Sequence, residues 1–204
     1  MSLPGKFITL EGVDGAGKST HVGFVAEWLR GQGREVIVTR EPGGTALGET
    51  LRELLLHREM AADTELLLMF AARQQHLAEL ILPALARGAW VVSDRFTDAS
   101  YAYQCGGRRI AAERIAALED WVQRGFAPDL TLLFDVPPAV AEERRSSVRA
   151  ADRFEQEAGS FFARVRDAYL VRARAEPHRI HVLDARQTID AVQAEIARLL
   201  QDLT

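Results

Sequence analysis

The sequence predicts an α/β fold in which five parallel strands form one sheet with helices on both of its faces. Two observations carry this prediction. Five short apolar runs alternate along the chain with amphipathic stretches of helical spacing, and strands separated by helices form parallel sheets that are covered on both sides. Hydrophobic residues also make up 48% of the chain and charged residues 26%, which is the composition of a globular domain.

The strands are predicted where apolar residues follow one another with few interruptions. These runs lie at residues 6–10, 35–39, 90–94, 129–135 and 179–183. A glycine-rich turn at 11–20 follows the first run, and Pro42 with the two glycines after it predicts a loop behind the second. The first strand therefore leads directly into a turn whose backbone can approach a ligand closely.

Helices are predicted from apolar residues at three- and four-residue spacing. The first such stretch runs from Val22 to Leu29, and Gly31 ends it. Asp63 is expected to cap a long helix, and Pro83 to kink or interrupt it. The further helices are predicted at residues 45–57, 63–82, 110–124, 154–174 and 189–200.

Length, charge and cysteine content limit the class of protein. With 204 residues, the chain is expected to form one domain, 1–204. Its one cysteine, Cys105, cannot form an internal disulfide, which favours a reducing compartment. The longest apolar run, 66–72, is far shorter than the roughly 18 residues that span a bilayer. The net charge of −4 argues against a nucleic-acid binder, so we expect a cytoplasmic protein with no membrane and no nucleic-acid partner.

The strongest functional signal is a phosphate-binding loop. The segment GVDGAGKS at 12–19 fits G-x-x-x-x-G-K-[ST], follows a predicted strand and opens a predicted helix. Lys18, expected to be accessible, would reach the β- and γ-phosphates of ATP, and Ser19 would hold Mg²⁺. The residues predicted to bind ATP are Gly12, Val13, Asp14, Gly15, Ala16, Gly17, Lys18, Ser19 and Thr20.

A second signal follows the third strand. Asp94 and Arg95 lie where ligands bind in open α/β sheets, beyond the carboxyl ends of the strands. Asp94 can hold a magnesium-bound water, and Arg95 can bind a phosphate with two N–H groups. Because the chain contains no asparagine, it cannot carry the N-K-x-D motif with which common GTPases bind guanine. The motifs therefore indicate a kinase or an ATPase.

Five segments together resemble bacterial thymidylate kinases. They are EGVDGAGKST (11–20), TREPGGT (39–45), FAARQQHL (70–77), SDRFTDASYAYQCGGR (93–108) and DRFEQE (152–157). The resemblance implies a nucleoside-monophosphate-kinase type of P-loop fold, and transfer of the γ-phosphoryl group of ATP to dTMP in dTTP biosynthesis. Two alternatives remain open: another P-loop kinase acting on dUMP or a deoxynucleoside, and an ATP-binding regulatory ATPase without an acceptor.

The resemblance also implies a set of dTMP-binding residues. Asp14 would lie near the sugar and phosphates, and Arg95 would bind the dTMP phosphate in a pocket shaped by Arg40 and Glu41. Phe70 would stack on thymine. The remaining roles are Arg73 on O4 of the base, Ser100 and Gln104 on the base edge, and Tyr103 against the 2′ position.

One catalytic arginine has to be placed elsewhere in this chain. Some thymidylate kinases carry it in the phosphate loop, where this sequence has Gly15. The arginine-rich segment at about 144–156 is expected to form a short mobile lid, with Arg153 and then Arg149 as the catalytic candidates. Family members are usually homodimers that pack through the counterpart of the 63–82 helix.

Overall fold

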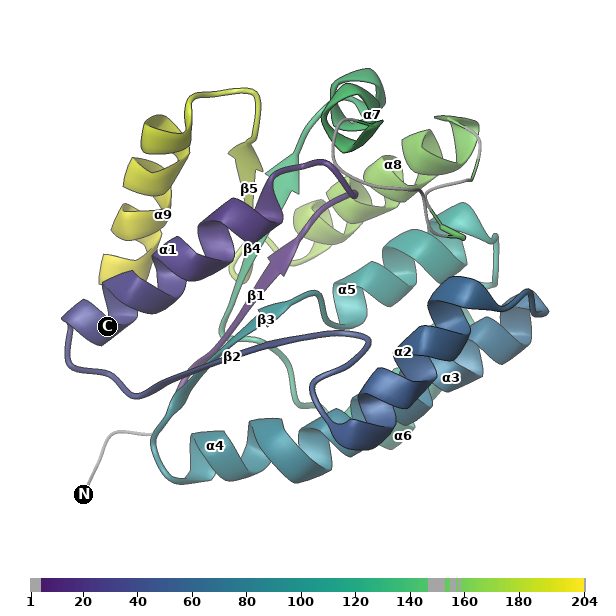
Figure 1. Ribbon diagram of the computed structural model, residues 1–204, viewed down its shortest axis with the longest axis horizontal. Coiled ribbons are helices and arrows are strands. Elements are labelled where there is room, and N and C mark those ends of the chain that lie inside the picture. The colour runs from purple at the N-terminus through teal and green to yellow at the C-terminus, as the bar shows by residue number, and fades with distance from the viewer. Residues whose placement is uncertain (1–4, 147–152, 155–156, 158, 204) are drawn as a thin grey trace.

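The five predicted strands form one parallel sheet. The computed structural model describes residues 5–146, 153–154, 157 and 159–203 (Figure 1). The strand order is β2-β3-β1-β4-β5, which confirms the predicted α/β fold. The strands are β1 (Phe7–Glu11), β2 (Val36–Arg40), β3 (Trp90–Asp94), β4 (Leu130–Asp135) and β5 (Ile180–Asp184).

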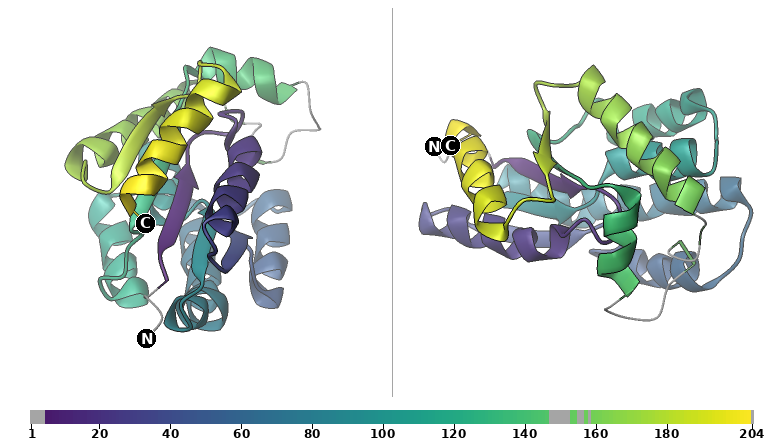
Figure 2. Two further views of the ribbon diagram at one scale, coloured as in Figure 1. Left: turned by 90° about the vertical axis from the view of Figure 1, so that its left-hand side faces the viewer. Right: turned by 90° about the horizontal axis from the view of Figure 1, so that it is seen from above.

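Two layers of helices cover the sheet (Figure 2). On one face, α1 (Lys18–Gly31) and α9 (Ile189–Leu203) pack with Ile8, Leu10 and Val92 in one core. On the other, Phe7 and Val91 pack against η1 and α4, and α8 (Gly159–Ala175) lies beside β4 and β5. The remaining elements are α2 (Ala46–His57), α3 (Ala62–His76), η1 (Leu77–Ile81), α4 (Leu82–Ala86), α5 (Thr97–Ser100), η2 (Tyr101–Gly107), α6 (Ala112–Gln123) and α7 (Pro138–Ser146), where η marks a π-helical segment.

The long helix predicted at 63–82 differs from the structure at both ends. Its path continues past Pro83 to Ala86, with the π-helical segment η1 directly before α4. A wider turn accommodates a residue that has no N–H group to donate. The expectation that Asp63 caps the helix is wrong, because the N-cap is Ala61 and Asp63 pairs with Arg114 of α6 at 2.7 Å.

Strand register brings three strand ends together. Asp94, the last residue of β3, lies beside Leu10 of β1 and Arg40 of β2. Parallel strands share one carboxyl edge, and open α/β sheets bind ligands there. The loop after β1, the loop after β2 and the short helix after β3 therefore meet at one place. Within the described residues, no helix has the length and apolar character to cross a membrane.

A buried ion network fixes the segment that follows β3. Asp98 of α5 is 2% exposed and accepts hydrogen bonds from Arg172 Nε of α8 at 3.0 Å and from Arg179 Nη1 at 2.8 Å. Arg179 Nη1 also donates to Thr131 Oγ1 of β4 at 2.7 Å. Since a buried charge is stable only when it is compensated, these contacts hold α5 against α8 and the sheet.

Replacing Asp98 with alanine leaves two guanidinium groups without their shared carboxylate. We expect the free energy of unfolding, measured by urea denaturation, to fall by roughly 3–5 kcal/mol. The control is Asp63→Ala, which breaks the exposed pair with Arg114 and should cost less than about 1 kcal/mol. Equal losses in the two variants would contradict a special role for the Asp98 network.

Candidate active site

The phosphate loop wraps around the ammonium group of Lys18. Lys18 Nζ donates to the carbonyl oxygens of Gly12 at 2.9 Å and Val13 at 3.1 Å, and the residue is 5% exposed. The expectation that Lys18 is accessible is therefore wrong, because the loop turns its own carbonyls towards the side chain. Burial, reinforced by the charge of Arg95, lowers the pKa of Lys18.

Gly15 has no space for a side chain. Its φ is +86°, and a Cβ atom built there would lie 2.1 Å from the carbonyl oxygen of Ala141 in α7. An arginine at this position would require α7 to move away from the loop. The loop and α7 as they stand therefore leave no room for an arginine at this position.

Arg95 joins the phosphate loop to two tyrosines. Its Nη2 donates to Asp14 Oδ1 at 2.7 Å and to the Tyr103 hydroxyl at 3.0 Å, and its Nη1 donates to the Tyr169 hydroxyl at 3.0 Å. Tyr103 in turn donates to Asp14 Oδ2 at 3.1 Å. Burial acts to raise the pKa of Asp14, but the charges of Arg95 and Lys18 outweigh it and hold the pKa below its usual value.

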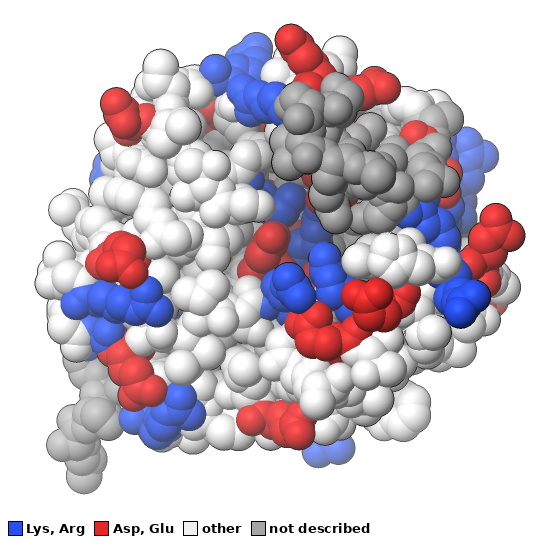
Figure 3. Space-filling view, in the orientation of Figure 1, with Lys and Arg blue, Asp and Glu red and all other residues white. Residues whose placement is uncertain are grey.

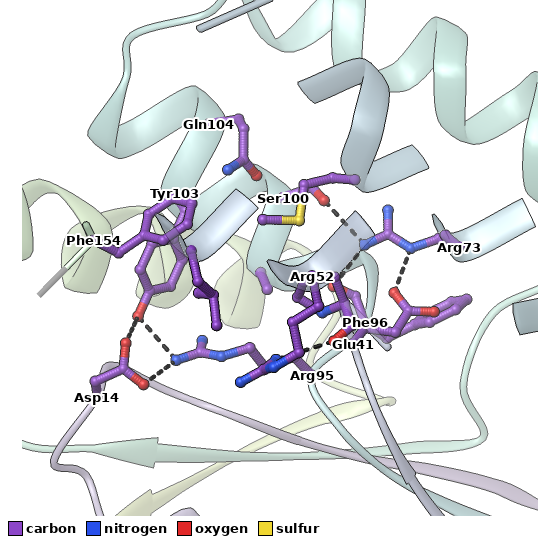
Figure 4. Close-up of a pocket in the computed structure, with 14 residues that line it drawn as sticks. Asp14, Glu41, Arg52, Arg73, Arg95, Phe96, Ser100, Tyr103, Gln104 and Phe154 are labelled. Atoms are coloured by element: carbon purple, nitrogen blue, oxygen red, sulfur yellow. Dashed lines mark hydrogen bonds and ion pairs between the residues drawn. The ribbon is translucent and has the colours of Figure 1, made fainter. Parts of the chain in front are cut away.

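A pocket, here named the acceptor pocket, opens beside Arg95 (Figure 4). Its walls come from the phosphate loop, the loop after β2, α2, α3, α5 and η2, and Figure 3 shows acidic and basic side chains gathered around a central hollow of the surface. The pocket is lined by Asp14, Glu41, Pro42, Arg52, Leu56, Met69, Arg73, Arg95, Phe96, Ala99, Ser100, Tyr103, Gln104 and Phe154.

Arg73 is the most constrained side chain of the acceptor pocket. It is 2% exposed, and its Nε donates to Glu41 Oε2 at 2.7 Å. Its Nη2 donates to Ser100 Oγ at 3.0 Å and to the Phe96 carbonyl at 3.2 Å. Glu41 is held from its other side by His76 Nδ1 at 3.0 Å. Nη1 of Arg73 is buried and has no hydrogen-bond partner among the described residues, so its N–H groups are unsatisfied there.

Most of the dTMP-binding residues expected from the resemblance lie in this pocket, but Phe70 and Arg40 do not. Phe70 is 2% exposed and packs with Leu66, Ile110 and Ile115. Neighbouring residues of a helix point about 100° apart, and Met69 is the one of the pair that lines the pocket. The Phe70 ring nevertheless lies under the guanidinium of the pocket residue Arg73, 4.6 Å from ring centroid to Arg73 Cζ, and its stacking on thymine stays a prediction.

Arg40 lies outside the lining of the acceptor pocket, whereas another arginine, Arg52, lines it. Arg40 is exposed and its Nη2 donates to Glu49 at 2.8 Å. Arg52 of α2 lines the pocket instead, and its Nη1 donates to the Pro42 carbonyl at 3.0 Å. Burial, followed by the charge of Arg40, lowers the pKa of Arg52. Arg52 and Leu56 both line the pocket, and their i, i+4 spacing puts them on one face of α2. This spacing is the sequence feature that could have indicated which face of α2 meets the pocket.

The predicted magnesium residues fit that ion. Asp94 Oδ1 is a buried oxygen without a hydrogen-bond partner among the described residues, and Ser19 is exposed in the first turn of α1. Carboxylate and hydroxyl oxygens are ligands that Mg²⁺ accepts.

On the other side of the loop, a second pocket is lined by Ala16, Gly17, Thr20, His21, Arg144, Ala185, Gln187, Ile189 and Val192.

The two predicted lid arginines have different outcomes. Arg149 lies outside the described residues. Arg153 is described, and its Nη2 pairs with Glu65 of α3 at 2.8 Å while its Nε donates to the Leu55 carbonyl at 3.0 Å. The structure thus places the Arg153 guanidinium at the ends of α2 and α3, and does not bring it to the phosphate loop.

The fold and site together define a P-loop kinase of the nucleoside-monophosphate-kinase type. A family model for thymidylate kinase matches residues 10–196. The chain is 57% identical to the thymidylate kinase of Methylobacillus flagellatus over 200 residues, with 98% of both chains covered. It is 59% identical to that of Cupriavidus necator over 200 residues, with 97% of this chain and 98% of the relative covered.

A solved structure of similar shape comes from Ehrlichia chaffeensis. This thymidylate kinase superposes with a TM-score of 0.80 and is 35% identical, covering 98% of this chain and 99% of the other. The present chain belongs to the thymidylate kinase family. The function of that family is the phosphorylation of dTMP to dTDP, with ATP as the phosphate donor.

The contact between Gly15 and α7 gives a test of loop geometry. Gly15→Ala should lower the melting temperature, because a Cβ at φ +86° meets the Ala141 carbonyl. Gly23→Ala is the matched control, since Gly23 is exposed on α1 and its added Cβ meets nothing within 4 Å. The control should be neutral or stabilise by up to about 1 kcal/mol. A Gly15 variant that melts with the wild type would show that α7 yields readily.

Proposed function

We propose that this chain binds dTMP in the acceptor pocket, with the dTMP phosphate at Arg95 and thymine at Arg73, and transfers the γ-phosphoryl group of ATP to that phosphate with Mg²⁺ bound. The observation that carries the proposal is a pair of guanidinium groups in one pocket. Arg95 adjoins the phosphate loop, and Arg73 is buried with one donor unpaired. The pocket therefore offers cationic contacts for a phosphate and, at Arg73 Nη1, an unpaired donor nitrogen for a neutral ring.

Cations would do most of the chemical work. The acceptor is already an ionised phosphate at pH 7, so the transfer depends on alignment and on neutralising charge, without a strong general base. Lys18, held inside the phosphate loop, would act on the β- and γ-phosphates. Arg95 would act on the acceptor phosphate, with Arg52 as a second cation in the position that we first expected for Arg40.

Magnesium would be held by Ser19 and, through a water molecule, by Asp94. The unpaired buried oxygen of Asp94 supports this assignment. When bound, Mg²⁺ would supply positive charge that neutralises the charge developing on the phosphates. The second pocket, between the phosphate loop and the Ala185 turn, would take the adenosine part of ATP. Arg149 and Arg153 stay proposed as cations that cover the transferred group when the segment around them closes.

At the base end, Arg73 Nη1 would donate to O4 of thymine. Ser100 and Gln104 would contact the base edge. Phe70, whose ring lies under the Arg73 guanidinium at 4.6 Å, would stack on thymine beside the pocket-lining Met69. Tyr103 would occupy the space beside the 2′ position and favour deoxyribose. Its hydroxyl is fixed by Arg95 and Asp14, so it cannot turn aside without breaking both contacts.

We also propose that the chain works as a homodimer in the cytoplasm. Large apolar side chains on α3, α4 and α6 support the dimer, because Leu67 is 57%, Leu82 45% and Trp121 73% exposed. A second copy would cover them. The one cysteine, Cys105, is free, in keeping with a reducing compartment.

Measuring ADP release with different acceptors distinguishes this function from the two alternatives, another P-loop kinase and a regulatory ATPase. In a coupled assay, ATP should give ADP with dTMP, and much less with dUMP, dCMP or thymidine. A kinase for dUMP or for a deoxynucleoside would show another order of acceptors. ADP release that does not depend on any acceptor would identify a regulatory ATPase and overturn the proposal.

The role of Arg73 can be measured separately. Arg73→Ala should raise the dTMP KM by roughly 10- to 100-fold, the effect of losing a charge-assisted hydrogen bond. The ATP KM should stay close to that of the wild type, because Arg73 lies in the acceptor pocket alone. Arg114→Ala, on the exposed surface of α6, serves as the control. An unchanged dTMP KM in folded Arg73→Ala protein would remove Arg73 from the site.

A further inference from the structure

Glu65 is a buried carboxylate that does not line the acceptor pocket but contacts a residue that does. It is 0% exposed, in the first turn of α3. Its Oε1 accepts a hydrogen bond from Gln104 Nε2 at 2.8 Å. Its Oε2 pairs with Arg153 Nη2 at 2.8 Å and with Arg108 Nε at 3.2 Å. Two cations thus balance its charge, and the carboxylate offers acceptors only.

This contact determines which way the Gln104 amide is turned. A glutamine amide has a donor end and an acceptor end, and in an open pocket it could present either. Because Glu65 can only accept, the NH₂ end of Gln104 has to face it. The carbonyl Oε1 is left over and has no hydrogen-bond partner within the described part of the chain. Gln104 is itself 1% exposed and lines the acceptor pocket.

We propose that Glu65 is a positioning residue for base selection, which acts by holding the carbonyl of Gln104 towards the nucleobase. An acceptor at this place pairs with a pyrimidine whose N3 carries a hydrogen, as in thymine and uracil. Cytosine has an unprotonated N3, so two acceptors would face each other. This inference rests on the proposed function, because it requires the base to lie against Gln104.

Arg73 supplies the opposite polarity in the same pocket. Its buried Nη1 is a donor, which suits the O4 carbonyl of thymine and opposes the 4-amino group of cytosine. Arg73 is a donor in any orientation, whereas Gln104 is an acceptor only while Glu65 holds it. Selection against cytosine therefore depends on a residue that contacts no substrate. The orientation of Gln104 by Glu65 gives no discrimination between dTMP and dUMP, which differ only in the 5-methyl group.

The test compares dTMP with dCMP as acceptors. Glu65→Gln keeps size and shape but offers a donor as well as an acceptor, so the Gln104 amide is free to turn over. We expect the ratio of kcat/KM for dTMP to kcat/KM for dCMP to fall about 10-fold, the usual effect of one misplaced hydrogen-bonding group. The change should come mainly from KM. This ratio does not depend on the fraction of folded enzyme, so lower stability alone would not move it.

A double-mutant cycle shows whether Glu65 acts through Gln104. In a Gln104→Ala background, adding Glu65→Gln should change the ratio by less than about 2-fold. A full 10-fold effect in that background would overturn the proposal, as would an unchanged ratio in Glu65→Gln itself. Glu119→Gln is the matched control, since Glu119 accepts from Tyr101 of η2 at 2.6 Å but contacts no residue of the acceptor pocket in the described structure. Its ratio should equal that of the wild type.

A second measurement covers the case in which Glu65→Gln does not fold. The side-chain amide signal of Gln104, assigned in NMR spectra by its loss in Gln104→Ala, should show slowed hydrogen exchange in the wild-type protein. Exchange as fast as that of an exposed glutamine would overturn the proposal. Failure of the proposed function is distinct, because wild-type enzyme would then show no turnover of dTMP at all.

Discussion

The position of Arg95 at the end of β3 is the constraint on which the rest of the site depends. Its φ is +73°, a left-handed conformation that turns the chain sharply out of the sheet. Backbone contacts hold it there, because its N–H donates to the Leu10 carbonyl at 3.0 Å and its carbonyl accepts from Ser93 Oγ at 2.8 Å. The guanidinium then reaches three other segments through Gly12, Asp14, Tyr103 and Tyr169.

The charges around Arg95 are arranged by contacts within the protein itself. Glu11 is 0% exposed and accepts from the Phe96 N–H and from the Tyr169 hydroxyl, both at 2.7 Å. Burial, followed by the negative charge of Asp98, raises the pKa of Glu11 to about 8. Asp14 stays ionised opposite Arg95. Under the proposed function, a phosphate bound here would meet donors oriented by the protein, and such preorganisation lowers the cost of stabilising charge during transfer.

The sequence predicted the features that depend on local pattern. The strands and the phosphate loop followed from apolar runs and from one motif, whereas the expectation that Arg73, Ser100, Tyr103 and Gln104 share a pocket came from the resemblance to thymidylate kinases. Packing decided the rest. Helical periodicity could not tell whether Met69 or Phe70 faces the pocket, since both lie near the face of Arg73. Nor could spacing show that the loop carbonyls bury Lys18, or that Arg52 rather than Arg40 lines the acceptor pocket, because these depend on how α1 and α2 meet the strand ends.

Two glycines show how packing positions the residues of the acceptor pocket. A Cβ on Gly106 would lie 2.7 Å from the Cβ of Ala168, and one on Gly107 would lie 2.5 Å from the ring of Phe161. Only a bare backbone lets α8 approach η2 this closely. This approach brings Tyr169 of α8 to Arg95. In the wide turn of η2, the Arg108 N–H donates to the Tyr103 carbonyl at 2.8 Å. That turn places Gln104 and Arg108 against Glu65. The Arg95 end and the Gln104 end of the acceptor pocket are therefore set by one helix contact.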